Sequence, residues 1–294
     1  MPLPIHRSFA SPEIRGADAI GPIHRQDEFE YSSRDGRNLT KHSHGGDARS
    51  MKTFRTAAEL EVGAANSAIF EASSDSVEAK LETFPRYVRR QHLKRFLALY
   101  EIFKKVLHTK GSIVECGVFR GFGFMSWCKL STILEPENLT RRIYGFDSFD
   151  GFPSIAPKDA NSVAQPEQGE LRASSKEELE ALLVQYDKDR FLGHIDKAHL
   201  FAGDATKTIP KFVEEHPHLV VSLLFLDFDL YEPTKVAIEQ FLPRMPKGSI
   251  IAFDELDNPI WPGETQAILS TVGMNRLRLE RIEWDPYISY AVID

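Results

Sequence analysis

The sequence predicts an α/β fold in which helices cover both faces of a mostly parallel β-sheet. Two observations predict it. From residue 111 onward, short apolar segments alternate with stretches whose apolar residues recur at helical spacing. Several apolar segments are followed directly by glycine or an acidic residue, as at the strand ends where α/β sheets bind ligands. Strands that alternate with helices form parallel sheets, because each crossover helix returns the chain to the same end of the sheet.

The composition is that of a globular protein. The chain has 294 residues, of which 42% are hydrophobic and 27% charged, so it can build a sizeable core. Its 36 basic and 43 acidic residues leave a net charge of −7, which favours neither nucleic acid nor an anionic membrane as partner. No apolar run reaches the roughly 18 residues of a membrane span. The N-terminus also lacks the basic-then-apolar pattern of a signal peptide. We therefore expect a cytoplasmic protein.

The two cysteines, Cys116 and Cys128, support that expectation. Two cysteines make no disulfide framework, and this spacing is not a zinc signature. We expect both to be reduced and mostly buried.

The N-terminal segment, residues 1–50, predicts a flexible arm because it is rich in polar residues and poor in periodic apolar ones. His42 and His44 lie in this arm. A metal site there would need further ligands, so a solvated tail is the favoured interpretation.

Residues 51–110 predict a helical cap with helices over 53–72 and 87–107. In the second helix, apolar residues recur at helical spacing, which indicates that this helix covers a face of the sheet. Its basic residues are expected on a solvated face and are compatible with a homodimer. The expected stripe consists of Leu93, Phe96, Leu97, Tyr100, Phe103 and Leu107.

Residues 111–294 carry the alternating elements. A capping-box pattern, Ser175 with Glu178, indicates a helix inside the long connection 151–198. Pro233 is expected in the first turn of a helix, where its missing N–H costs little. Helices are also predicted over 122–134 and 206–213. Strands are predicted over 112–116, 142–146, 199–201, 220–226 and 249–253, with a closing pair over 277–284 and 288–293.

The loop after the first strand has the chemistry of a cofactor site. Gly117 and Gly121 let the backbone turn tightly and approach a ligand, and Arg120 lies between them. The spacing differs from the dinucleotide pattern, and Glu115 would repel a pyrophosphate. An acid suits a cation instead, and the ammonium and sulfonium groups of S-adenosylmethionine carry that charge. The alternative is a glycine-rich turn without a ligand.

Acidic residues also follow the second and third strands. Asp147, with Ser148 beside it, is placed to accept both ribose hydroxyls of a nucleoside. Asp150 is interpreted as a turn residue. Asp204 is expected either to reach the adenine amino group or to cap the helix that follows, and the two roles can coexist.

Two acidic residues follow each of the fourth and fifth predicted strands. Asp227 and Asp229 follow one strand, and Asp254 and Glu255 follow the other. If the strands are neighbours, the carboxylates converge and repel one another unless protons or a cation neutralise them. Oxygen-only ligands select a hard cation such as Mg²⁺, Mn²⁺ or Ca²⁺. The alternative interpretation is that the acids cap helices.

Three motifs together resemble the macrocin O-methyltransferase family. They are VECGVFRG at 114–121, YGFDSFDGFP at 144–153 and LDFDLYEPT at 226–234, and they occur in the family's order. The resemblance covers roughly residues 83–294. It implies methylation of sugar hydroxyls in natural products, with S-adenosylmethionine as the methyl donor.

The resemblance also implies a Rossmann-like class I methyltransferase fold. Its seven-stranded, mostly parallel sheet has the order 3-2-1-4-5-7-6, which makes the fourth and fifth strands neighbours. Carried over to this sequence, the family's pattern makes Asp227 a Mg²⁺ ligand and Asp229 the general base. The family usually has two aspartates after the fifth strand, whereas this chain has Asp254 and Glu255. The longer Glu255 puts the ligand distance or the metal preference in doubt.

These observations predict a divalent-metal-dependent O-methyltransferase, with Mg²⁺ or Mn²⁺, that acts on a hydroxyl of a sugar or a related natural product. A metal that binds two adjacent hydroxyls would favour vicinal diols. A metal-dependent glycosyltransferase with a D-x-D triplet is one alternative, against which Glu115 argues. A D-x-D-x-[TV] phosphatase is disfavoured because Tyr231 stands where Thr or Val is required. A non-catalytic protein that retains the fold is the third alternative.

Overall fold

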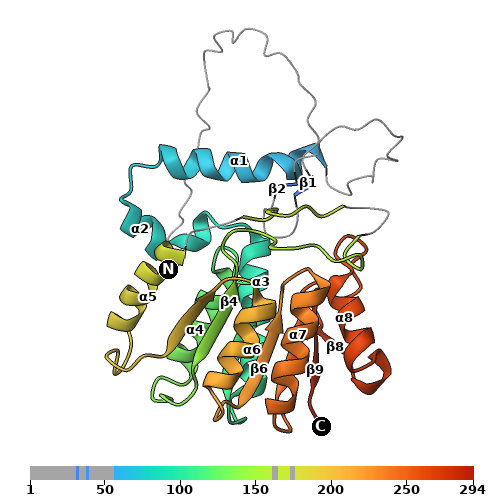
Figure 1. The fold of residues 1–294 in the computed structure, drawn as a ribbon. Helices are drawn as coiled ribbons and strands as arrows, with labels where there is room; N and C mark the ends of the chain where they lie inside the picture. The colour runs from blue at the N-terminus through green and yellow to red at the C-terminus, as the bar shows by residue number, and fades with distance from the viewer. Residues whose placement is uncertain (1–30, 33–37, 40–55, 161–164, 173–175) are drawn as a thin grey trace, which may run out of the picture. The chain divides into compact units, whose positions relative to one another are not determined.

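The structure, a computed structural model, describes residues 31–32, 38–39, 56–160, 165–172 and 176–294 (Figure 1). The chain divides into two units, residues 1–49 and 50–294. In the first unit, β1 (Tyr31–Ser32) pairs antiparallel with β2 (Asn38–Leu39). The rest of the predicted arm, with His42 and His44, lies outside the described residues. The predicted division at residue 110 stays a prediction.

A seven-stranded sheet forms the centre of the second unit within the described residues (Figure 1). The strand order is β5-β4-β3-β6-β7-β9-β8, which confirms the predicted order 3-2-1-4-5-7-6 and the Rossmann-like fold. The first five strands are parallel, β9 is antiparallel to β7, and β8 is antiparallel to β9. The strands are β3 (Ser112–Cys116), β4 (Ile143–Asp147), β5 (Ala198–Ala202), β6 (Val221–Leu226), β7 (Ile250–Phe253), β8 (Glu280–Ile282) and β9 (Asp285–Val292).

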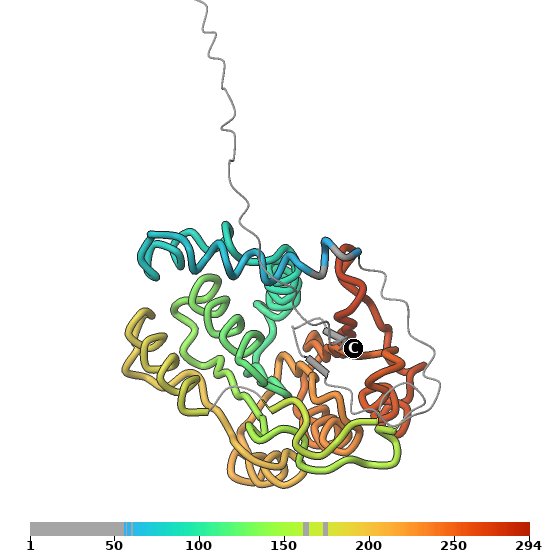
Figure 2. The backbone as a smooth tube through the Cα atoms, turned by 90° about the horizontal axis from the view of Figure 1, so that it is seen from above, coloured from blue at the N-terminus to red at the C-terminus, as the bar shows by residue number. Residues whose placement is uncertain are grey.

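Helices cover both faces of this sheet. In Figure 2, α3 and α4 lie on one side of the strands, and α6 and α7 lie on the other. The longer helices are α1 (Ala57–Ala72), α3 (Arg90–Val106), α4 (Phe122–Leu134), α5 (Lys176–Lys188), α6 (Ala205–Glu215), α7 (Tyr231–Phe241) and α8 (Gly263–Thr271). Shorter turns of helix are α2 (Val77–Glu82), η1 (Phe84–Arg86), η2 (Leu242–Arg244) and η3 (Met274–Arg276). No helix of the described part is long and apolar enough to cross a membrane.

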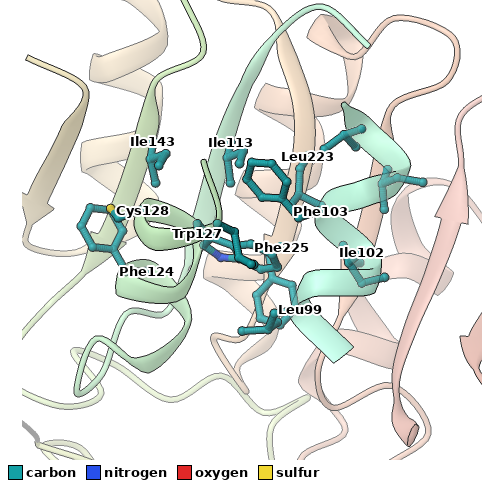
Figure 3. Close-up of a cluster of buried hydrophobic side chains, with 14 of the residues drawn as sticks. Leu99, Ile102, Phe103, Ile113, Phe124, Trp127, Cys128, Ile143, Leu223 and Phe225 are labelled. Atoms are coloured by element: carbon teal, nitrogen blue, oxygen red, sulfur yellow. The ribbon is translucent and has the colours of Figure 1, made fainter. Parts of the chain in front are cut away.

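The buried strand β6 explains why the core has two halves. All six of its residues are buried, as expected for a strand covered on both faces. Side chains alternate along a strand, so Leu223 and Phe225 join the core under α3 and α4, whereas Leu224 and Leu226 join the core under α6 and α7. Figure 3 shows the first half, where Trp127 of α4 lies beside Phe225.

The buried stripe of α3 differs from the predicted one. Of the predicted residues, Phe103 is fully buried, but Leu97 is 50% exposed. Phe96, Tyr100 and Leu107 pack against the core from its margin. The helix is therefore rotated relative to the expectation, so that Leu99 and Ile102 face the sheet in place of Leu97. The fully buried residues are Ala98, Leu99, Ile102, Phe103 and Val106.

Most predicted elements lie within a few residues of their observed bounds. Helix α1 begins later than predicted, because Thr56 and Glu59 form a capping box at its start. Helix α2 was not predicted. Both cysteines are buried free thiols, as expected, and burial raises their pKa values well above the ordinary range.

The loops after β3 and β6 touch one another at Gly117. Its φ is +98°, and an added Cβ would lie 2.0 Å from the carbonyl oxygen of Asp227. Only glycine combines that conformation with such a close approach. The contact brings the predicted cofactor loop against the predicted acidic loop at the carboxyl ends of the strands.

Candidate active site

Two of the predicted acids meet at the ends of β6 and β7. These strands are neighbours, with Leu226 opposite Phe253, so Asp227 and Asp254 leave the sheet side by side. Arg95 of α3 lies between them. Its Nη1 donates to Oδ1 of Asp254 at 2.6 Å, and its Nη2 donates to Oδ2 of Asp227 at 3.1 Å. Of the four acids predicted to converge, these two thus meet, and both carboxylates bind one arginine.

Asp229 is buried and held in an unusual backbone conformation. Its φ is +63°, a left-handed value that aspartate tolerates better than most residues. The start of α8 packs against it: a Cβ on Gly263 would lie 2.3 Å from the carbonyl oxygen of Asp229. The backbone of α8 therefore fixes where the predicted base lies.

Glu255 is joined by an acid that the sequence analysis did not single out as a site residue. The backbone N–H of Glu255 donates to Oε2 of Glu264 at 3.1 Å, and Asn258 donates to Oε2 of Glu255. Glu264 is fully buried, and its Oε1 has no hydrogen-bond partner among the described residues. Burial raises the pKa of Glu264 well above its usual range, and the charges of Asp229, Asp254 and Glu255 raise it further. Glu264 therefore favours its protonated form.

The donor chemistry of the acidic loops fits a hard divalent cation. Asp227 and Asp254 offer oxygen atoms, and they already converge on one cationic group, the Arg95 guanidinium. The carboxylate of Glu255 faces Asn258 instead. Among the residues that the structure describes, no three His, Cys, Asp or Glu side chains are arranged to hold a metal ion. Metal binding by Asp227, Asp254 and Glu255 thus stays a prediction.

Glu115 lies at the end of β3, next to β6 in the sheet. Its side chain is buried, and its Oε2 has no hydrogen-bond partner in the described part of the chain. Gly123 makes room for it, since a Cβ there would lie 2.3 Å from Oε1 of Glu115. Burial raises the pKa of Glu115 well above its usual range, and the charge of Arg95 opposes that rise. The Trp127 side chain also lies within hydrogen-bonding range of this carboxyl and lowers its pKa. Binding of a cationic group by Glu115 stays a prediction.

Asp147 joins the loops after β3 and β4. Its Oδ2 accepts hydrogen bonds from the N–H groups of Val118 at 2.8 Å and Phe119 at 2.7 Å, and its Oδ1 accepts one from Phe149 at 2.7 Å. Phe119 and Phe149 both have positive φ values, so Asp147 stabilises strained turns. A carboxylate oxygen can accept two hydrogen bonds, so Oδ1 retains capacity for a ribose hydroxyl.

The remaining cofactor candidates lie in the same loops or at the start of α6. The Arg120 guanidinium lies over the ring of Phe119. Gly121 has a φ of +79° and precedes α4. Ser148 donates from Oγ to the carbonyl of Gly151 at 2.5 Å.

Asp204 caps α6, as one of the two interpretations expected. It accepts a hydrogen bond from the N–H of Thr206 at 3.0 Å and pairs with Lys207 at 2.9 Å. Its role toward adenine stays a prediction.

The loop after β4 is anchored by a buried acid that the sequence analysis missed. Oδ1 of Asp159 accepts a hydrogen bond from the N–H of Tyr231 at 2.6 Å, at the start of α7. Farther back in the loop, Phe152 packs edge-on against Trp261, which is buried as a hydrophobic plug. Polar residues in a long loop carry no local signal for such contacts. Arg95 was missed for a similar reason, since it stands among basic residues that were expected on a solvated face.

Comparison with known proteins yields one family. The model of the Macrocin-O-methyltransferase (TylF) family matches residues 86–285. A curated relative from Streptomyces olivaceus, 8-demethyl-8-(2,3-dimethoxy-alpha-L-rhamnosyl)-tetracenomycin-C 4'-O-methyltransferase, is 26% identical over 146 residues. That stretch is 49% of this chain and 52% of the relative, so the chain aligns with about half of the relative's length.

Solved structures resemble the whole sheet region. The calicheamicin methyltransferase CalS11 is 32% identical, with a TM-score of 0.79 over 85% of this chain and 99% of that one. The apo structure of CalS11, described as a TDP-rhamnose 3'-O-methyltransferase, is 30% identical, with a TM-score of 0.70 over 82% and 96% of the two chains. The O-methyltransferase NovP, 18% identical with a TM-score of 0.54 over 80% and 96%, shares the fold.

Proposed function

The chain belongs to the macrocin-O-methyltransferase family, and from this membership we propose that it transfers a methyl group from S-adenosylmethionine to a sugar hydroxyl. Both the curated relative and CalS11 carry rhamnose in their names. The acceptor proposed here is accordingly a hydroxyl of a 6-deoxyhexose, either linked to a nucleoside diphosphate or attached to an aglycone.

The proposal is carried by one feature of the strand ends. Asp227 and Asp254 converge at the ends of β6 and β7, and Glu115 lies one residue before the end of the adjacent strand β3. We propose that the cofactor lies over β3 and β4 and the acceptor over β6 and β7. Glu115, Gly117, Arg120, Gly121, Asp147, Ser148 and Asp204 are the proposed cofactor residues.

In the proposed mechanism, S-adenosylmethionine supplies a methyl group on a positively charged sulfur. The acceptor oxygen attacks the methyl carbon in line with the departing sulfur, and Asp229 takes the hydroxyl proton. Burial of Asp229 excludes water from the proton transfer. A divalent cation held by Asp227, Asp254 and Glu255 would supply stabilisation of the alkoxide form of the hydroxyl. Glu115 is proposed to bind the ammonium group that donor and product share.

The direct test is methyl transfer from S-adenosylmethionine to TDP-rhamnose and to a rhamnosyl glycoside, with and without EDTA. We expect methylation of one of the two acceptors, loss of turnover in EDTA, and recovery with Mg²⁺ or Mn²⁺. An Asp229→Asn protein should bind S-adenosylhomocysteine normally and lose about a hundredfold or more in kcat, as expected when a general base is removed. Turnover that survives EDTA would exclude the metal role. Binding of UDP-sugars without binding of S-adenosylhomocysteine would favour a glycosyltransferase instead.

A further inference from the structure

Arg95 brings a cation to the strand ends from a distant part of the chain. It lies 159 residues before Asp254 and 132 residues before Asp227. The three side chains are nearly enclosed, with exposures of 14% for Arg95, 0% for Asp254 and 11% for Asp227. A partly desolvated guanidinium between two carboxylates is a stronger interaction than a surface ion pair.

We propose that Arg95 is a positioning residue of the methyl-transfer site. Its two terminal nitrogens hold the carboxylates of Asp227 and Asp254, from neighbouring strands, in one relative orientation. This inference rests on the proposed function.

The geometry of the guanidinium explains why arginine suits this role. It is planar and presents its N–H groups in a fixed fork, so one side chain can orient two acceptors at once. A lysine ammonium is a point charge and cannot fix that geometry. Arg95 binds Oδ2 of Asp227 and Oδ1 of Asp254, one oxygen of each. A carboxylate that binds a metal or a substrate through one oxygen commonly has its other oxygen held by such a neighbour.

Arg95 belongs to a part of α3 that is packed against the sheet. Leu99 and Ile102 follow it at helical spacing and are fully buried against the sheet. Arg95 thus continues the buried stripe of α3 up to the strand ends, where an apolar side chain could not bind Asp227 and Asp254. Two desolvated carboxylates repel, and the cation between them offsets that cost.

The charge of Arg95 also reaches the cofactor half of the site. Burial raises the pKa of Glu115 well above its usual range, and the charge of Arg95 opposes that rise. One guanidinium therefore opposes the effect of burial at an acid on β3 while it binds acids that follow β6 and β7.

The test compares Arg95→Lys with the wild-type protein and with Lys94→Met. Lys94 is the neighbouring cation on α3 and lies near Asp285 and Tyr287, away from the acidic loops. Active sites are counted by calorimetry with S-adenosylhomocysteine. Arg95→Lys keeps the charge but loses the fork geometry. We expect its kcat per site to fall at least about tenfold, since supporting contacts of this kind contribute about 10–100-fold to activity. The KM for S-adenosylmethionine should stay within about threefold of the wild-type value. Lys94→Met should leave both unchanged.

A second measurement needs no activity. Arg95→Met should lower the Tm by about 4 °C or more, because it removes two charge-assisted hydrogen bonds between nearly enclosed side chains. The double variant Arg95→Met, Asp254→Asn should regain part of that loss. The inference is overturned if Arg95→Lys keeps its kcat, or if the double variant regains no stability. If the wild-type protein binds S-adenosylhomocysteine but methylates no sugar, the proposed acceptor is wrong. The Tm values of Arg95→Met and the double variant still decide whether Arg95 holds the two acids.

Discussion

At the scale of single residues, burial decides the chemistry of this site. Glu115 and Glu264 are both enclosed, and burial raises the pKa of each well above its usual range. Arg95 opposes the rise at Glu115, whereas three neighbouring acids reinforce it at Glu264. The two acids thus share the same direction of pKa shift but differ in the charge of their neighbours.

Replacing Glu115 with glutamine tests the cofactor role. The change keeps the shape that Gly123 accommodates and removes the charge. We expect the affinity for S-adenosylhomocysteine, measured by calorimetry, to fall about tenfold or more, because hydrogen bonds to charged groups contribute about 1.5–3 kcal/mol. Glu101→Gln, a surface change on α3, is the matched control. Unchanged affinity in Glu115→Gln would assign the cofactor's ammonium to another residue.

His199 gives the stability of the protein a pH dependence. It stacks on Tyr144, and burial lowers its pKa from the ordinary value near 6.5. The folded state therefore binds a proton less readily than the unfolded state, so stability is present above about pH 6.5 and is lost as the pH falls through the lowered pKa. We expect the Tm of His199→Gln to decline less than that of the wild type between pH 7.5 and pH 5.5. Equal declines would contradict the assignment.

At the scale of elements, close contacts hold the loops at the carboxyl ends of the strands in place. The start of α8 meets the loop between β6 and α7 at Gly263, the loop after β3 meets the same loop at Gly117, and Asp159 ties the long connection to α7. Each contact joins two elements that the sequence separates. The position of Asp229 follows from these contacts between loops rather than from β6 alone.

Gly263→Ala tests this dependence. The added methyl would lie 2.3 Å from the carbonyl oxygen of Asp229 and 2.6 Å from the backbone nitrogen of Tyr231, so backbone must move. We expect a loss of about 1–3 kcal/mol in the free energy of unfolding, measured by urea denaturation, and a lower kcat. Gly63→Ala in α1 is the control. Its nearest neighbour would be 3.9 Å away, so it should be neutral or stabilising by up to about 1 kcal/mol.

At the scale of the whole molecule, the two ends of the sheet differ. At the amino ends of the strands, Arg141 is buried and fully engaged. It donates to the carbonyls of Gly111 at 3.0 Å and Val106 at 2.9 Å, to Ser222, and to Glu135 at 3.0 Å. At the carboxyl ends, acids crowd together and backbone angles are strained. The amino ends of the strands thus carry a buried hydrogen-bond network that stabilises the fold, and the carboxyl ends carry the strained loops and the candidate site residues.

Arg141→Met separates the two ends experimentally. Removing one partner of a buried network costs about 3–5 kcal/mol, so the Tm and the yield of folded protein should fall. The kcat per site that binds S-adenosylhomocysteine should remain at the wild-type value, in contrast to Arg95→Lys. A large loss of kcat per site would show that the two ends of the sheet are coupled.

The sequence by itself determined the α/β class, most element positions and the residues at the strand ends. Periodicity and strand-end acids are local signals, and the three motifs identified the family and therefore the strand order. That order places Asp227 beside Asp254. The same local reasoning placed Leu97 on the buried side of α3 and Arg95 on a solvated face. The structure corrects both placements.

Only the tertiary structure decided which groups surround those acids. Arg95 reaches Asp254 across 159 residues, three backbone N–H groups occupy Asp147, and Glu264 is enclosed by its neighbours. No pattern within a segment encodes these contacts, because each depends on two elements that meet only after the sheet has formed. The sequence thus identifies the acids at the strand ends, and the packing of α3 and α8 against those ends sets their charge and orientation.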